Sequence, residues 1–111
     1  MPSFKTARNA EDIKRELTDI FRSLKDPRVT GMLSIVSLDL SGDGSWCKVY
    51  VSSLEGLETA QNAVKGLTSA AGFIRREIGL RLKMRHTPQF LFIADDGIAH
   101  SAEINKKLRD L

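Results

Sequence analysis

Apolar residues recur every three or four positions in the N-terminal part of the chain. Within residues 7–25 the spacing fits one stripe along an amphipathic helix. Thr6 or Asn9 can supply the oxygen that caps its first turn. Pro27 lacks an amide hydrogen and disfavours a helical conformation at the preceding residue, so we expect the helix to end at residue 25. The stripe consists of Ile13, Leu17, Ile20, Phe21 and Leu24.

The next segment has the pattern of a β-hairpin. Apolar side chains stand at adjacent as well as alternate positions of residues 33–40, so we expect this strand to be covered on much of both faces. Residues 41–44, SGDG, are a strong turn signal. Residues 46–52 are rich in β-branched and aromatic side chains, as strands prefer. Together these runs predict two antiparallel strands.

A second helical pattern covers residues 57–83 and contains its own weak points. Its apolar stripe continues through Ala70, Ala71 and Gly72 without losing register, which predicts one bent helix or two short helices that share a face. Glycine in a helix interior costs about 1 kcal/mol relative to alanine, so Gly66 and Gly79 are further candidates for the bend. The stripe consists of Leu57, Ala60, Val64, Leu67, Ala71, Ile74 and Ile78.

The remaining segments complete an α+β pattern. Residues 90–94 read as a buried strand after Pro88, residues 95–97 as a turn, and residues 98–111 as a short helix. The order predicts a single domain over residues 1–111, with flexible ends at residues 1–6 and in the C-terminal helix at residues 98–111. A three-stranded sheet with helices on one face is its natural packing, which leaves the other face to solvent or a partner.

Charge adds a second pattern to this fold. The formal net charge is +3, from 17 Lys and Arg against 14 Asp and Glu. Basic residues outnumber acidic ones in residues 1–28 and 75–111, whereas acids prevail between them, so the surface field is expected to exceed what the net charge suggests. No apolar run approaches the roughly 20 residues that a bilayer requires. The single cysteine, Cys47, fits a reducing cytosol, and we expect a cytoplasmic protein.

Residues that could carry catalysis are few. Cys47 lies inside a predicted strand, where a structural role is typical of cysteine. Asp95 and Asp96 follow a strand and are expected to cap a turn. A hydrolase that uses His100 with Asp95 is the weakest of the readings, because His100 fits a surface position better. No metal-ligand spacing, phosphate loop or dinucleotide motif is present, so we expect no enzyme and no cofactor.

The strongest chemical signal is a basic run at residues 75–85. It sets five cations against the single acid Glu77, and its arginine forks suit phosphate groups. A solvated helix face is the alternative interpretation. A bend before Phe73 would expose backbone amides that attract anions, and Gly72 would let another backbone approach closely. Otherwise the small residues merely allow packing on the sheet. The cations are Arg75, Arg76, Arg81, Lys83 and Arg85.

The order of elements resembles a type II KH domain, an RNA-binding fold. The G-x-x-G loop that clamps nucleotides in KH domains is replaced here by Ala70-Ala71-Gly72. With that replacement, the whole chain resembles the bacterial ribosome-binding factor A family. The motifs that carry the resemblance are LKDPRVTG from Leu24, KVYVSSL from Lys48, AAGFIRREIGLRLKMRHTPQFLF from Ala70, and the closing DDG.

The resemblance implies a non-enzymatic factor that binds the free small ribosomal subunit and its rRNA. The family assists late assembly and maturation of that RNA near its 5′ end, and supports growth in the cold. For this chain it implies a monomer without membrane contact, with an interhelical kink at Ala70, Ala71 and Gly72. The residues implied to face RNA are Arg8, Arg28, Arg75, Arg76, Arg81, Lys83 and Arg85.

Two alternatives stay open beside this interpretation. Arg28 can pair with Asp26 or cap the preceding helix instead of facing RNA. The protein can also be a protein-binding adaptor that uses the open sheet face near Trp46 and Tyr50. An adaptor would bind its partner with weak salt dependence and without the arginines.

Overall fold

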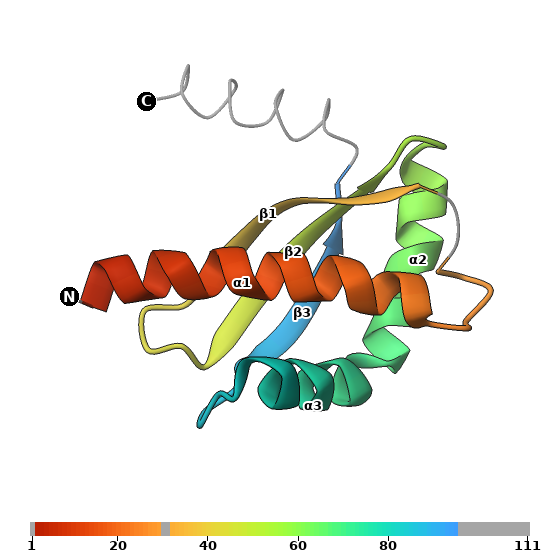
Figure 1. Ribbon diagram of the computed structural model, residues 1–111. Coiled ribbons are helices and arrows are strands. Elements are labelled where there is room, and N and C mark those ends of the chain that lie inside the picture. The colour runs from red at the N-terminus through yellow and green to blue at the C-terminus, as the bar shows by residue number, and fades with distance from the viewer. Residues whose placement is uncertain (1, 30–31, 96–111) are drawn as a thin grey trace, which may run out of the picture.

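The computed structural model describes residues 2–29 and 32–95, with side chains from residue 10 onward (Figure 1). The predicted helix at residues 98–111 and most of the preceding turn lie outside the described residues. The elements in chain order are α1 (Pro2–Ser23), β1 (Leu33–Leu40), β2 (Trp46–Ser53), α2 (Leu57–Ser69), α3 (Ala71–Leu82) and β3 (Gln89–Ala94). The predicted α+β class is confirmed.

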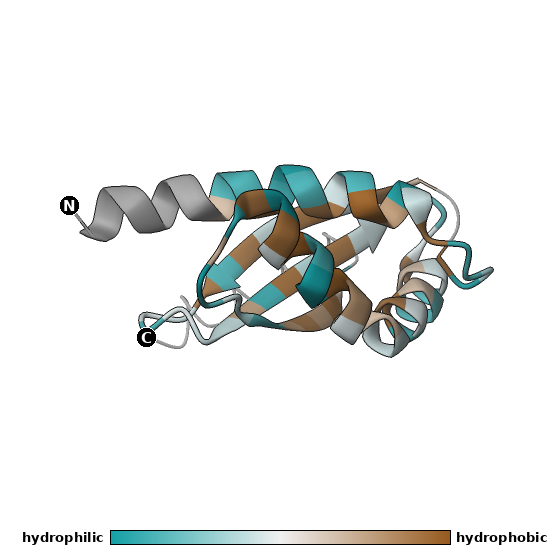
Figure 2. Cartoon of the chain, turned by 60° about the horizontal axis from the view of Figure 1, so that its bottom comes forward, coloured by the Kyte–Doolittle hydropathy of each residue, from teal (hydrophilic) through white to brown (hydrophobic). Residues whose placement is uncertain are grey.

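Helix α1 forms where its apolar stripe predicts, although its bounds differ. It begins at Pro2, before the expected start, and ends at Ser23, two residues before the expected end. The Ser23 hydroxyl donates a hydrogen bond to the carbonyl of Ile20 at 2.8 Å, within the last turn. Ile13, Leu17 and Ile20 are fully buried. The stripe therefore faces the sheet, and Figure 2 shows hydrophilic positions on the opposite side of the helix.

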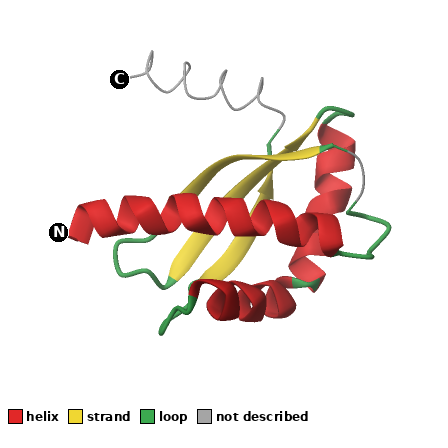
Figure 3. Ribbon diagram, viewed as in Figure 1, coloured by secondary structure: helices red, strands yellow, loops and turns green. Residues whose placement is uncertain are grey.

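The three strands form one mixed sheet in the order β1-β2-β3 (Figure 3). Strands β1 and β2 are antiparallel and are joined by the predicted turn, in which the Asp43 carboxylate accepts hydrogen bonds from Ser41 and Ser45. These bonds, the Ser45 hydroxyl first, lower the pKa of Asp43 to about 2. Strand β3 pairs with β2 in parallel, because helices α2 and α3 carry the chain back across the sheet.

The described helices cover one face of this sheet, and within residues 32–95 no helix packs on the other. In β2 the side chains of Cys47, Val49 and Val51 are buried, and the side chains between them point to the open face. The expectation that β1 is covered on both faces is wrong, because Val36 is 42% exposed. A register shift between Ile35 and Ser37 explains its position. The extra residue interrupts the alternation of faces, so Ile35 points inward while its two successors face solvent.

The long helical pattern forms two helices that meet at Ala70. Ala70 and Ala71 pack partly buried against the core. No other part of the described chain lies close to Gly72, because a Cβ placed on it would meet nothing within 4 Å. The crowded glycines are Gly66 and Gly79, where a Cβ would lie 2.7 Å from Val29 and Thr87 respectively. Other parts of the described chain therefore approach the two helices closely at Gly66 and Gly79, on either side of the break, and not at Gly72.

Candidate nucleic-acid interface

The break between α2 and α3 sets the direction of the basic helix. Ala70 has φ −94° and ψ 8°, which departs from regular helix geometry. Its N–H donates to the carbonyls of Gly66 and Leu67, at 3.1 Å each, while its own carbonyl accepts from the N–H of Ile74 at 2.9 Å. No side chain caps the start of α3. The first-turn amides and the positive end of the helix dipole therefore favour an anion there.

A hollow of about 860 Å³ lies along α3. Three segments line it: the outer side of α3, the hairpin turn at residues 43–45, and residues 84–89 after the helix. Arg75, Arg76 and Arg85 lie at this hollow, with His86 beside them. Asp43 is the acidic residue in its lining, and the carboxylate of Asp43 already accepts hydrogen bonds within the hairpin turn. We call this feature the basic hollow.

Arg75 is held in place by the segment that follows α3. Its Nε donates a hydrogen bond to the carbonyl of Thr87 at 3.1 Å, which leaves the rest of the guanidinium exposed. Thr87 can lie this close to the helix because Gly79 has no side chain. Arg76 and Arg85 are exposed. The structure thus brings together three of the five cations in the basic run at one hollow.

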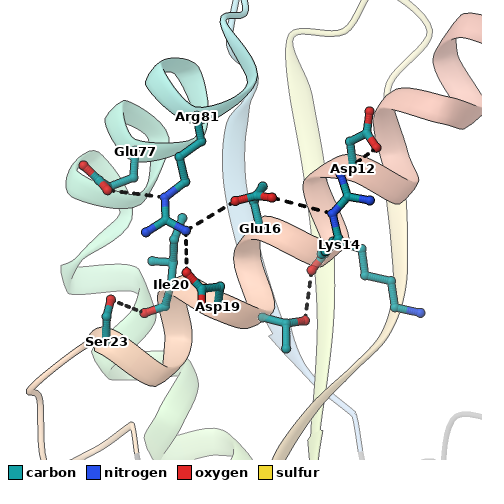
Figure 4. Close-up of polar contacts among 10 residues, drawn as sticks. Asp12, Lys14, Glu16, Asp19, Ile20, Ser23, Glu77 and Arg81 are labelled. Carbon is teal, nitrogen blue, oxygen red and sulfur yellow. Dashed lines mark hydrogen bonds and ion pairs between the residues drawn. The ribbon is translucent and has the colours of Figure 1, made fainter.

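The other two cations of the run lie elsewhere. Lys83 ends α3 in the left-handed conformation, with φ 51°, and is exposed outside the hollow lining. Arg81 turns toward α1, where its Nη1 lies 2.6 Å from Asp19 and 3.3 Å from Glu16 (Figure 4). Its Nε lies 3.5 Å from Glu77 of its own helix. These acids, Asp19 first, raise the pKa of Arg81, whose charge binds α3 to α1.

Arg28 is also engaged within the protein. Its Nε and Nη2 donate to the two carboxylate oxygens of Asp26, at 3.0 and 2.7 Å, and Nη2 lies 3.3 Å from the hydroxyl of Ser69. Hydrogen bonds from the Arg28 side chain, then its backbone, lower the pKa of Asp26 to about 2. The structure therefore shows the alternative in which Arg28 pairs with Asp26. The contact with Ser69 fixes the corner after α1 against the end of α2.

The remaining sequence candidates contribute little to this surface. Arg8 belongs to α1, and its side chain lies outside the described ones. Cys47 is fully buried, and burial, with a smaller contribution from Asp39, raises the pKa of its thiol to about 11, which agrees with a structural role. His100 is outside the described residues. Among the helices that the structure describes, none is long and apolar enough to cross a membrane.

Residues 5–108 match the family model described as ribosome-binding factor A. The chain belongs to the ribosome-binding factor A family. A ribosome-binding factor A from Acetivibrio thermocellus is 44% identical over 104 residues, which cover 93% of this chain and 85% of the relative. The Clostridium novyi member is 38% identical over 112 residues, covering 100% of this chain and 93% of the relative.

Solved structures of ribosome-binding factor A share the fold. The crystal structure of the Thermus thermophilus factor has a TM-score of 0.70 and 30% identity, covering 79% of this chain and 92% of that one. A homology model of the Thermus thermophilus factor, fitted into a cryo-EM map of its complex with the 30S subunit, has a TM-score of 0.65 and 29% identity. That match covers 77% of this chain and 89% of the other. The sequence resemblance to the ribosome-binding factor A family is thereby confirmed.

Arg81 and Arg76 should differ in their effect on stability when each is changed to alanine. Arg81→Ala leaves Glu16, Asp19 and Glu77 without their shared cation, so we expect a lower midpoint of urea unfolding. Added salt should narrow the difference from wild type, because it screens the acids from one another. Arg76→Ala, at an exposed arginine of the same helix, is the matched control and should leave the midpoint unchanged. An Arg81→Ala protein of normal stability would contradict the structural role of this ion cluster.

Proposed function

We propose that this protein binds free small ribosomal subunits through the phosphate backbone of their rRNA, with the basic hollow as the contact surface. It acts as a monomeric, non-enzymatic factor in the cytoplasm. There it assists late assembly and maturation of the small-subunit RNA near its 5′ end, and supports growth in the cold. The observation that carries the proposal is the convergence of Arg75, Arg76 and Arg85 on one exposed hollow.

The placement of the cations supports a division of roles. Arg75, Arg76 and Arg85 contact phosphates, and Lys83 extends the positive surface at the end of α3. Arg28 and Arg81 are held by acids, so we assign them to positioning the corner and the basic helix. Arg8 remains a predicted RNA contact on α1. The complex of the Thermus thermophilus factor with the 30S subunit supports the choice of partner.

A fixed basic shape suits folded RNA. We infer that the chain is a type II KH-like domain in which the break at Ala70 replaces a flexible nucleotide clamp. Both sides of this break are anchored, by Arg28 on Ser69 and by Arg81 on α1. Folded RNA is recognised largely through its shape and backbone, which a rigid array of guanidinium groups can match.

Sedimentation with purified ribosomal particles tests the proposal. We expect the protein to pellet with free small subunits, and to pellet far less with large subunits or joined ribosomes. Binding to small subunits should weaken steeply as salt rises, because phosphate contacts release counterions. Equal association with all three particles, or binding that is indifferent to salt, would reject it.

A further inference from the structure

An exposed tryptophan lies next to the basic hollow on the open face of the sheet. Trp46 begins β2 and is 47% exposed. It pairs in register with Gln89, the first residue of β3, and Gln89 lines the basic hollow. Ser45, which precedes Trp46, also lines the hollow, and neighbouring strands lie about 4.8 Å apart, so the backbone at Trp46 adjoins the rim of the hollow. The backbone fixes this proximity, because the N–H of Gln89 donates to the carbonyl of Ser45 at 2.9 Å.

The surroundings of Trp46 combine an apolar surface with positive charge. Leu91, 45% exposed, lies diagonally across from Trp46 on the same face of the sheet. Lys48 is exposed two residues along β2, on that face as well. Asp39 lies opposite Lys48 in the β1–β2 register and offsets its charge. Uncompensated positive charge at this end of the sheet therefore comes mainly from the arginines of the basic hollow.

We propose that Trp46 is a stacking platform for an unpaired RNA base, on a strand whose backbone is held at the basic hollow. This inference rests on the proposed function and adds to it a contact with single-stranded RNA. Aromatic side chains beside a positive channel are the usual means of binding single strands, since every base offers a flat face. The contact is absent from an intact duplex, whose bases are stacked on one another. Trp46 thus selects RNA with an unpaired nucleotide at this position.

A protein partner is the competing occupant of the same patch. The arginines of the hollow favour RNA, because the hollow that would hold a polyanion extends to Gln89, the strand partner of Trp46. An apolar protein surface would satisfy Trp46 and Leu91, but it would leave the adjacent guanidinium groups without a counter-charge. Binding of RNA would depend steeply on salt and would require an unpaired base, whereas binding of a protein partner would depend weakly on salt and require no base.

Trp46 is the only tryptophan of the chain, so its fluorescence reports this contact directly. The full chain is titrated with a nine-residue oligoadenylate and with an RNA duplex of the same length. We expect the single strand to quench the emission and the duplex to leave it nearly unchanged. By anisotropy of a labelled single strand, Trp46→Leu should weaken binding about 5- to 150-fold, whereas Trp46→Phe should retain most of the affinity. Leu54→Ala, at a residue 80% exposed beyond the end of β2, should bind as wild type.

The outcomes separate this inference from the proposed function. If Trp46→Leu binds the single strand as wild type does and no quenching occurs, the stacking role is wrong, even where small subunits still bind. If Trp46→Leu loses small subunits while oligoadenylate neither binds nor quenches, the patch serves a protein and the inference is overturned. Loss of binding by arginine variants alone bears on the proposed function, not on Trp46. The circular dichroism spectrum of each variant verifies that it is folded.

Discussion

Replacing Arg75, Arg76 and Arg85 together with alanine is expected to weaken binding to small subunits by about 10²- to 10³-fold. A hydrogen bond to a charged group contributes about 1.5 kcal/mol, so each phosphate interaction that is removed lowers the affinity about tenfold. The salt dependence should change as well. If each arginine neutralises one phosphate, the slope of log affinity against log salt should become shallower by about 2 to 3.

The measurement is binding of labelled protein to purified small subunits across a series of salt concentrations. A triple alanine variant at Lys14, Arg22 and Lys65 is the matched control, because it removes the same charge from exposed positions on α1 and α2. We expect the control to keep an affinity close to wild type and an unaltered slope. Equal losses in the two triple variants would mean that net charge, not the basic hollow, governs binding. An unchanged affinity in the arginine variant would refute the assigned surface.

Local periodicity was sufficient to predict the elements that the structure describes and much of the core. The stripe of Ile13, Leu17 and Ile20 identified the buried side of α1, because residues spaced three or four apart lie on the same side of a helix. The hairpin followed from the turn at residues 41–44. The bulge at Val36 was not predictable in this way, since an extra residue in one strand depends on pairing with the other.

The basic surface was predicted only as a run of residues. Sequence spacing does not reveal that Arg81 meets Asp19, which lies 62 residues earlier in the chain. Nor does it show that Arg75 is oriented by the carbonyl of Thr87 across the end of α3. Such pairings depend on how helices cross, so a list of cations overstates the surface proposed to bind phosphate. Angular positions on a helix indicate only which cations lie together.

The sequence pattern points to Gly72 as the constrained glycine, whereas the structure constrains Gly66. The small-residue run drew attention to Gly72, because it adjoins the break and the basic helix. In the structure Gly72 is open, whereas Gly66 is buried inside α2 against the corner after α1. A Cβ on Gly66 would lie 2.7 Å from a methyl group of Val29 and 3.2 Å from the Asp26 carboxyl group. Asp26 is fixed by Arg28, so the corner has little freedom to retreat.

Gly66→Ala should therefore destabilise the protein by about 1 to 2 kcal/mol in urea unfolding. The strain of forcing a methyl group into this contact is about 1 to 3 kcal/mol, and the better helix propensity of alanine offsets at most about 1 kcal/mol of it. Gly72→Ala is the matched control, with the same chemical change in a neighbouring helix. Because nothing opposes its Cβ, we expect it to be neutral or to stabilise by up to about 1 kcal/mol. If Gly66→Ala and Gly72→Ala shift the unfolding midpoint equally, the corner after α1 moves to accommodate the new methyl group. Close contact at Gly66 would then not be what holds α2 against this corner.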